Sequence, residues 1–263
     1  MLIHNFTIGA DPELFIINSK TGKVVSSIGL IPGVKGNPYT DECMPNGFGL
    51  ETDNILAEFN IPPCKTMEEF VNNIEWMKNY IRGFVQQKDS DFDIKCSASE
   101  IVDDDQLQSD EAKLFGCSVD YNVYTESANP KPKGETTNLR SAGCHIHFGY
   151  DGYNTATSLE LIRLFDLFLG VPSVLMDSDK KRRDLYGKAG AFRLTPYGFE
   201  YRVLSSYMMS SPDLLIEVWH GIINAINAFN AGLKCKDSIS VISAINNSDK
   251  ELAEKICKKY KLL

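Results

Sequence analysis

Apolar residues recur every three or four positions in four parts of the chain, which is the spacing of a helix with one buried face. The predicted helices begin at Thr66, Thr157, Ser211 and Ser248. Thr66 and Glu69 form a capping-box pattern, and the apolar spacing that follows them runs as far as Val85. Pro172 is expected to limit the second helix, because proline disrupts a helix interior.

Between these helices, apolar and polar residues alternate, which predicts strands with one buried face. The strands are expected at residues 7–18, 54–61, 143–150, 190–194 and 199–204. Strands and helices follow no regular βαβ order, so the fold class is α+β rather than doubly wound α/β. We expect one catalytic domain over residues 1–263. Two long loops rich in Gly, Pro and Asn, 29–49 and 127–138, are expected to cover a site.

The polar faces of four predicted strands carry side chains that can bind metal ions or phosphate. Side chains two positions apart on a strand point to the same side of the sheet. The pairs that share a face are Asp11 with Glu13, Glu58 with Asn60, His145 with His147, and Glu200 with Arg202. Ordinary surface strands show mixtures of Lys, Thr, Ser and Glu, so these pairs indicate a site.

Clustered carboxylates repel one another unless a cation lies among them, so these pairs favour a divalent metal. Carboxylate oxygens suit Mg²⁺ or Mn²⁺, and a histidine ligand shifts the preference toward Mn²⁺ or Zn²⁺. Each pair also has an ordinary explanation. Asp11 and Glu13 could lie at an exposed edge or at a turn forced by Pro12, and Glu200 and Arg202 could form a cross-strand salt bridge. Two of the four histidines of the chain fall in the His145–His147 pair, which strengthens the metal interpretation.

Cationic residues precede Glu200 in the sequence. They are Lys180, Arg182, Arg183, Lys188 and Arg193. Arginines beside a metal site are suited to phosphoryl transfer, because negative charge spreads over the oxygens of the transferred group. The alternative is ordinary surface charge, which we prefer for Lys180. The chain has no GxxxxGK[ST] motif, so ATP would not be held by a P-loop.

Composition excludes several classes of protein. A formal net charge of −8 argues against nucleic acid as a general partner and against an anionic membrane surface. Seven cysteines form no C-x-x-C pair, which favours reduced thiols in a cytoplasm over a disulfide framework or structural zinc. No apolar run is long enough for a membrane span, and residues 1–8 do not resemble a signal peptide. We therefore expect a cytoplasmic protein, in the host cytoplasm if a phage encodes it.

Five segments, in this order, resemble a known family. They are GADPELF, AEFNIPP, RSAGCHIHFG, YGKAGAFR and GFEYRVLSS. Together they resemble the phage COOH–NH2 ligase type 2 family, a divergent branch of the glutamine synthetase and glutamate–cysteine ligase superfamily. The resemblance runs from Ile8 to about Ser206. It implies a glutamine synthetase-like fold, in which a curved antiparallel sheet has helices packed on its outer face.

The resemblance also implies roles for individual residues. The metal ligands would be Asp11, Glu13, Glu58, Asn60, His145 and Glu200. The nucleotide and its phosphates would contact His147, Arg193 and Arg202. From the cationic stretch itself, and not from the resemblance, we add Arg182, Arg183 and Lys188 as expected phosphate contacts. Catalysis would involve Arg193, Arg202 and Glu200. In glutamate–cysteine ligases the first pair is usually Glu-x-Glu, so Asp11 is a shorter ligand at its position.

Enzymes of this kind use ATP with Mg²⁺ or Mn²⁺, commonly two or more ions, to convert a carboxylate into an acyl phosphate that an amine then attacks. The expected substrates are small-molecule or peptide carboxylates and amines. Two alternatives stay open at this point. One is phosphoryl transfer without ligation, because phosphagen kinases resemble the same fold, and the other is a non-catalytic phage protein that retains the sheet. Metal-dependent hydrolysis lacks its usual helix-borne motifs.

Overall fold

A large antiparallel sheet forms the centre of the protein in the computed structural model, which describes residues 2–113, 120–130 and 137–262. Within these residues the sheet has ten strands. The order along its main path is β3 (Gly49–Asp53), β4 (Leu56–Cys64), β1 (Phe6–Asn18), β10 (Cys144–Tyr150), β12 (Gly198–Tyr201), β11 (Ala191–Thr195), β7 (Tyr121–Asn122) and β8 (Ser127–Ala128). Two further strands, β2 (Val24–Val25) and β5 (Phe92–Lys95), pair with the second half of β1. A separate pair joins β6 (Ser99–Ile101) and β9 (Leu139–Ser141).

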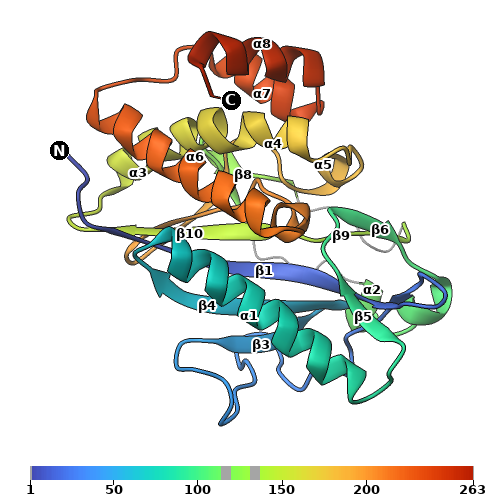
Figure 1. Cartoon of the computed structure of the whole chain (residues 1–263). Coiled ribbons are helices and arrows are strands. Elements are labelled where there is room, and N and C mark those ends of the chain that lie inside the picture. The colour runs from blue at the N-terminus through green and yellow to red at the C-terminus, as the bar shows by residue number, and fades with distance from the viewer. Residues whose placement is uncertain (1, 114–119, 131–136, 263) are drawn as a thin grey trace.

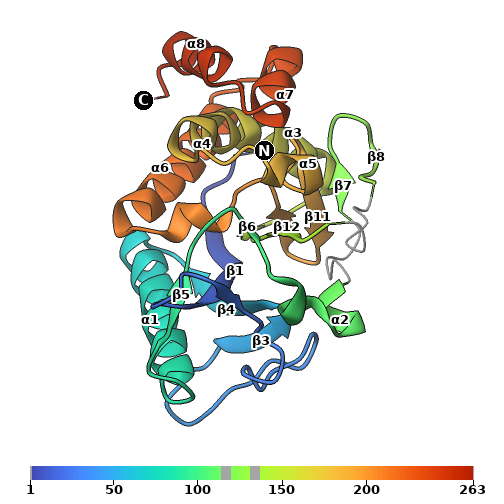
Figure 2. The same ribbon diagram turned by 90° about the vertical axis from the view of Figure 1, so that its right-hand side faces the viewer.

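The helices gather on one side of this sheet (Figure 1). They are α1 (Met67–Gln86), α3 (Thr155–Phe165), α4 (Val171–Met176), α6 (Pro212–Asn230), α7 (Ser238–Asn246) and α8 (Lys250–Tyr260), with the short helix α5 (Arg182–Leu185). A further short helix is α2 (Asp110–Lys113). Single turns lie at Asp104–Leu107, Asp166–Gly170 and Ser206–Met209. Figure 2 shows α1 and α6 on one side of the strands and α2 and β8 on the other. Helices α7 and α8 contact α4 and form an outer layer. The expected antiparallel sheet with helices is confirmed.

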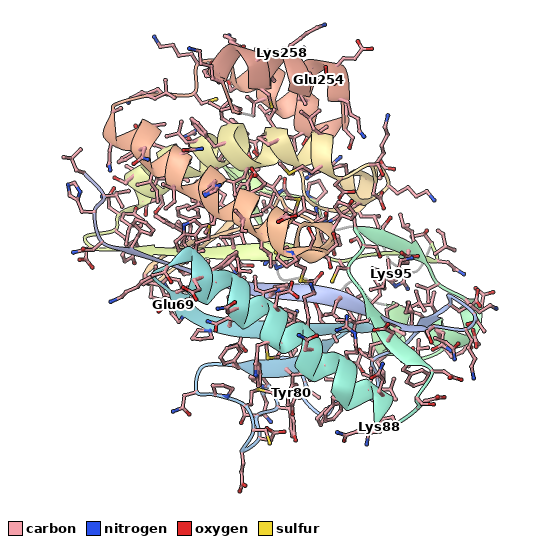
Figure 3. The ribbon with its side chains drawn as sticks, in the orientation of Figure 1. Glu69, Tyr80, Lys88, Lys95, Glu254 and Lys258 are labelled. Carbon is pink, nitrogen blue, oxygen red and sulfur yellow. The ribbon has the colours of Figure 1, made fainter. Side chains whose placement is uncertain are left out.

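Helix α1 has the predicted start. The backbone N–H of Glu69 donates to Thr66 Oγ1 at 3.2 Å, and the Glu69 carboxylate accepts from the Thr66 N–H at 3.2 Å. Figure 3 shows Glu69 at this end of α1 and Lys88 just beyond the other end. Every predicted apolar residue from Phe70 to Val85 is fully buried. A cap of this kind stabilises a helix by about 1 kcal/mol. The capping pattern in the sequence therefore favours the start of the helix at this position.

The second predicted helix is longer than its sequence indicated. It starts after Asn154, whose side chain accepts from the Thr157 N–H at 3.0 Å. Pro172 does not end it, which corrects the prediction. The helical path passes through a π-helical turn, Asp166–Gly170, and resumes as α4 with Pro172 in its first turn. Proline is tolerated there because the π-helical turn before it already interrupts the regular α-helical hydrogen bonds.

Other boundaries differ for local reasons. The terminal helix α8 is capped by Asp249 and not by Ser248, whose φ of 48° is left-handed and unlike an N-cap. Helix α7 was not predicted, because its β-branched Ile and Val residues weaken the helical signal. Strand β4 starts at Leu56 rather than Asn54, which has a φ of 58° in the preceding turn. The third helix, capped by Ser211, begins as predicted.

The apolar sides of the central strands form the core beneath the helices. Phe148 and Phe199 are fully buried, and each packs edge-on against Phe165 of α3 with ring centroids 5.5 and 5.2 Å apart. Ile146 and Tyr201 on the same two strands are also buried. The alternation in β10 and β12 therefore assigns the helix side correctly and leaves the opposite side to polar residues.

Three further expectations concern the second long loop, the cysteines and membrane spans. Of the predicted loop 127–138, residues 131–136 lie outside the described residues. Six cysteines carry free thiols, and the seventh, Cys117, also lies outside the described part. Within the described residues, no helix combines the length and the apolar character that crossing a membrane requires.

Candidate functional site

Strand register brings the predicted polar pairs together on the side of the sheet opposite the helices. Asp11 of β1 pairs with His145 of β10, and His147 pairs with Glu200 of β12. On the other side of β1, Glu13 pairs with Glu58 of β4. Segments far apart in sequence thus present their carboxylates and imidazoles along adjacent strands.

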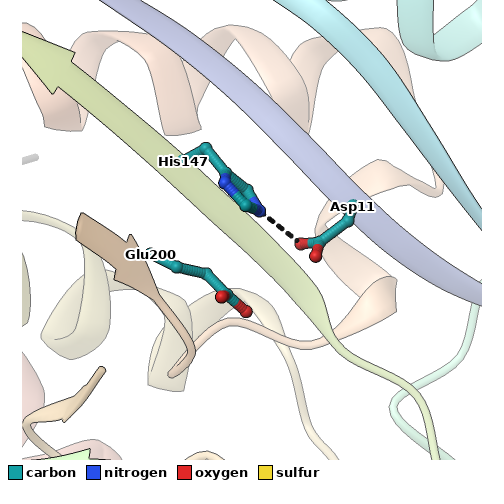
Figure 4. A group of neighbouring side chains, drawn as sticks. All are labelled: Asp11, His147 and Glu200. Carbon is teal, nitrogen blue, oxygen red and sulfur yellow. Dashed lines mark ion pairs between the residues drawn. The ribbon is translucent and has the colours of Figure 1, made fainter. Parts of the chain in front are cut away.

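The first cluster contains Asp11, His147 and Glu200 (Figure 4). His145 lies beside them. Asp11 Oδ1 lies 3.1 Å from His147 Nε2 and 3.6 Å from His145 Nδ1. Glu200 Oε1 lies 3.5 Å from His145 Nδ1. Four side chains from three strands therefore direct their ligand-type atoms to one place.

Three of these atoms have no hydrogen bond, although they are buried. They are Asp11 Oδ1, His145 Nδ1 and His147 Nε2. Buried polar atoms without partners are costly, and ones that face each other suggest a missing ligand. Adjacent ligands of an octahedral cation with 2.1 Å bonds lie about 3 Å apart. The spacing and chemistry of this cluster fit a divalent cation such as Mn²⁺ or Mg²⁺.

The contacts in this cluster also shift its ionisation. Although burial opposes ionisation, the contacts with His145 and His147 lower the pKa of Asp11 below its ordinary value. Burial opposes the charged form of His147 as well, but the close contact with Asp11 and the negative charge of Asp11 raise the pKa of His147 overall. Asp11 is therefore a carboxylate at neutral pH and can act as an anionic ligand.

Glu200 is fully buried and is held by two arginines. Arg193 donates to Glu200 Oε2 through Nε at 2.6 Å, and its Nη2 lies 2.5 Å from the same oxygen. Arg202 donates to Glu200 Oε1. The arginine side chains differ in exposure, at 37% for Arg193 and 7% for Arg202. Glu200 thus forms an ion pair across strands with Arg193 and another with Arg202 two residues further along the chain, and the same carboxylate belongs to the candidate metal cluster.

A second cluster lies on the other side of β1 and contains Glu13, Asp53 and Glu58. Glu13 is buried, and its Oε2 accepts from the Gly143 N–H at 2.6 Å. Burial raises the pKa of Glu13, and the charge of Asp53 adds to this effect. Burial followed by the charges of Asp11, Glu13 and Asp53 raises the pKa of Glu58 well above its ordinary value. Three carboxylates this close are a second candidate cation site.

The sequence analysis missed Asp53 and its neighbour Glu51. Both lie in β3, where Glu51 pairs with Glu58 across the sheet. Lys35 from the 29–49 loop places its Nζ 3.3 Å from Asp53 Oδ1, and the Gly36 N–H donates to Glu51 at 3.2 Å. The spacing of Glu51 and Asp53 was the same two-residue signal used elsewhere. The 29–49 loop, which was expected to cover a site, contacts the acidic residues of β3 through Lys35 and Gly36.

Beside His147 the same face has a hollow of about 480 Å³. Its walls include Gly9, Asn60, Pro62 and Tyr197. The Tyr197 hydroxyl is 2.6 Å from His147 Nδ1. Burial, together with the charges of Asp11 and Glu200, raises the pKa of Tyr197, so the hydroxyl keeps its proton at neutral pH. A ligand bound to the first cluster would have this hollow next to it.

Several predicted residues make other contacts. The Asn60 amide donates to Gly47 O at 2.7 Å and lines the hollow. Arg182 donates to Val203 O at 2.9 Å and to Ala142 O at 3.2 Å, and it lines a small recess with Glu13, His145 and Arg202.

Two other cationic side chains that were predicted to bind phosphate lie apart from the first cluster. Arg183 is buried and donates to Val203 O at 2.8 Å and to Ser173 Oγ at 3.3 Å. Lys188 lines a different recess, next to Tyr186 and Asp120. Phosphate binding by Arg183 and Lys188 therefore stays a prediction from the sequence.

Comparison with protein families bears on what this arrangement does. Residues 134–258 match the family model for phage phiEco32-like COOH.NH2 ligase-type 2. This match confirms the resemblance inferred from the five segments. It supports an enzyme that joins a carboxyl group to an amine.

The ligase-type 2 match covers just under half of the chain and contains the part of the candidate site that lies on β10, β11 and β12. It includes His145, His147, Arg193, Glu200 and Arg202. The carboxylates of β1, β3 and β4 precede it in sequence, yet the sheet places them against it. The match begins later and ends later than the motif resemblance, which ran from Ile8 to about Ser206. No curated protein matches the sequence.

Proposed function

We propose that the protein is an ATP-dependent carboxylate–amine ligase that forms an amide or peptide-like bond through an acyl phosphate at a divalent-metal site. The observation that carries this proposal is the convergence of unpaired buried atoms from Asp11, His145 and His147 beside Glu200, in a chain that matches a COOH–NH2 ligase family. We also propose a glutamine synthetase-like fold in one catalytic domain over residues 1–263, acting in a cytoplasm.

Two cation sites fit the residues present. Asp11, His145, His147 and Glu200 would hold one ion, and Glu13, Asp53 and Glu58 would hold another. Bound cations would neutralise the phosphate charge that these carboxylates otherwise repel. This assignment adds Asp53 to the ligands inferred from sequence and moves His147 from the nucleotide toward the metal.

The arginines on Glu200 are suited to the transferred phosphoryl group. The arginine contacts take up most of the acceptor positions of the Glu200 carboxylate, which weakens its binding of a cation. Arg193 is the more exposed of the two arginines, so we expect it to release Glu200 and turn toward phosphate oxygens. Arg202 would stay in place and fix the carboxylate. The guanidinium charge then stabilises the transition state of phosphoryl transfer.

The hollow beside His147 fits the nucleotide base and ribose, because it is large and partly apolar and adjoins the first cluster. The recess near Arg182 and Arg202 has a volume of about 10 Å³, room for about one water molecule, so it gives no binding place for the carboxylate substrate. In this arrangement a substrate oxygen attacks the γ-phosphorus and ADP leaves. The amine then attacks the acyl carbon, loses a proton and expels phosphate.

The test is ADP release from ATP with Mg²⁺ or Mn²⁺ across a panel of amino acids, peptides and amines. A ligase releases ADP only when both an acid and an amine are present, whereas a phosphotransferase needs one acceptor. Glu200→Gln should lower the rate at least about 100-fold, because it weakens a ligand and two arginine contacts together. The matched control is Glu217→Gln, an exposed residue of α6, which should not change the rate. Wild-type protein that binds neither Mn²⁺ nor ATP would favour a non-catalytic role and end the proposal.

A further inference from the structure

Several contacts fix the position of Tyr197, although nearly half of its surface is exposed. It lies in the two-residue turn between β11 and β12, after Pro196, whose ring fixes one backbone angle. The Tyr197 carbonyl accepts from the Tyr150 N–H at 3.2 Å, which attaches the turn to the end of β10. The backbone at Tyr197 is therefore held between two strands.

The ring reaches His147 by passing over a glycine. A Cβ on Gly149 would lie 3.4 Å from Tyr197 Cδ2 and 3.0 Å from Thr7 Oγ1. Both contacts are tight, so a side chain at Gly149 would crowd the tyrosine ring. The glycine leaves room for the Tyr197 hydroxyl to approach to 2.6 Å from His147 Nδ1.

The other nitrogen of the same imidazole faces the first cluster. His147 Nε2 is buried, has no hydrogen bond and lies 3.1 Å from Asp11 Oδ1. A neutral imidazole carries one proton, and a metal-bound nitrogen carries none. With a cation on Nε2, the proton must lie on Nδ1, where the Tyr197 hydroxyl oxygen can accept it. Partners of this kind orient ligand histidines and commonly change metal affinity about 10- to 100-fold.

We propose that Tyr197 is a positioning residue that orients His147 and holds its Nδ1 proton, so that Nε2 is presented to a divalent cation in the first cluster. The inference rests on the proposed metal-dependent function. It adds a residue that neither the sequence motifs nor the family match identified, and it gives the β11–β12 turn a role in metal binding.

The experiment measures Mn²⁺ affinity by calorimetry on the purified full chain without ATP. Tyr197→Phe keeps the ring and removes the hydroxyl, and the affinity should fall about 10- to 100-fold. Tyr153→Phe is the matched control, because Tyr153 is similarly exposed and its ring contacts Tyr150. The control should bind Mn²⁺ like the wild type. Gly149→Ala, which crowds the same ring without removing the hydroxyl, should also weaken binding.

A second readout follows the imidazole itself. With ¹⁵N-histidine labelling and diamagnetic Zn²⁺, only four rings contribute, and a His147→Asn spectrum identifies the right one. The wild type should show a slowly exchanging proton on His147 Nδ1 that Tyr197→Phe loses, a change that a purely structural role would not produce.

The outcomes separate the two proposals. If the wild type binds Mn²⁺ and Tyr197→Phe binds within threefold of it, the role of Tyr197 is overturned while the metal site stands. If the wild type binds no Mn²⁺, both fail. Should Tyr197→Phe not fold, unchanged Mn²⁺ affinity in Gly149→Ala overturns the inference instead.

Discussion

Replacing Glu58 by Gln should stabilise the metal-free protein and weaken its stabilisation by metal, which is an unusual pair of effects. Glu58 has carboxylate oxygens of Glu13 and Asp53 within 4.8 Å. At an effective dielectric constant of 20, two charges at that distance repel by about 3 kcal/mol. Protonation limits the cost, because holding a proton at pH 7 on a carboxyl of ordinary pKa costs about 4 kcal/mol.

Two contacts lower this cost in the native protein. Lys35 lies near Asp53, and the Gly143 N–H bonds to Glu13. We therefore expect Glu58→Gln to raise the free energy of unfolding by about 1–3 kcal/mol at pH 8 without metal. For a chain of this length the unfolding midpoint should rise by roughly 2–6 °C.

The gain should depend on pH in a defined direction. Because the pKa of Glu58 is raised in the folded state, the native protein keeps its proton to higher pH than the unfolded chain. Wild-type stability is therefore highest below the ordinary carboxyl pKa and falls as pH rises through the folded value. The difference between variant and wild type should be small at pH 4 and largest at pH 8.

The assay is thermal unfolding with and without Mn²⁺ at each pH. A ligand at 100 times its dissociation constant stabilises a protein by about 2.7 kcal/mol, and Glu58→Gln should lose much of that stabilisation. Glu217→Gln, exposed on α6, is the control and should change neither value. A variant that is less stable than the wild type without metal at pH 8 would show that the carboxylates do not repel, and the reasoning would be refuted.

Two further predictions address the core and the hollow. Burial raises the pKa of Asp166 to about 7, so the wild type loses stability as pH rises from the ordinary carboxyl range through 7. Relative to wild type, Asp166→Asn should gain about 3 kcal/mol between pH 5 and pH 8 in chemical denaturation, and a pH-independent difference would contradict the assignment. Gly9→Val should fill part of the hollow and weaken ATP binding at least about 10-fold by calorimetry. Mn²⁺ affinity should stay within threefold, because a Cβ at Gly9 meets only ordinary contacts at 3.6 and 3.7 Å and does not disturb the fold. Unchanged ATP affinity would show that the nucleotide does not bind in this hollow.

The strand periodicity predicted most of the site because a strand has only two sides. Once Ile146 and Phe148 are assigned to the core, His145 and His147 must face away from it. The same argument applies to Glu200 and Arg202. Register between strands does not follow from this pattern, so the sequence could not indicate that Asp11 lies opposite His145 while Glu13 lies opposite Glu58. The division into two clusters needed the structure.

What the sequence missed has identifiable causes. Asp53 ends a short strand after a long Gly- and Pro-rich segment, and its alternation was too brief to stand out. Tyr197 lies in a turn, where no periodicity applies. Pro172 was given too much weight, because a π-helical turn before it allows the helical path to continue.

The polar face of this sheet lowers the stability of the fold, and burial of the apolar face under the helices compensates for it. Along β1, β10 and β12 every carboxylate or imidazole in the clusters has apolar neighbours that are buried under the helices, such as Ile146 beside His145 and Tyr201 beside Glu200. Removing water from these strands strengthens both the repulsion between carboxylates and their attraction for a cation. A site built this way is poorly stable when empty and well matched to a bound cation. We expect substitutions on the core side, such as Phe148→Ala, to weaken metal binding only by unfolding the sheet, whereas substitutions on the polar side separate metal binding from stability.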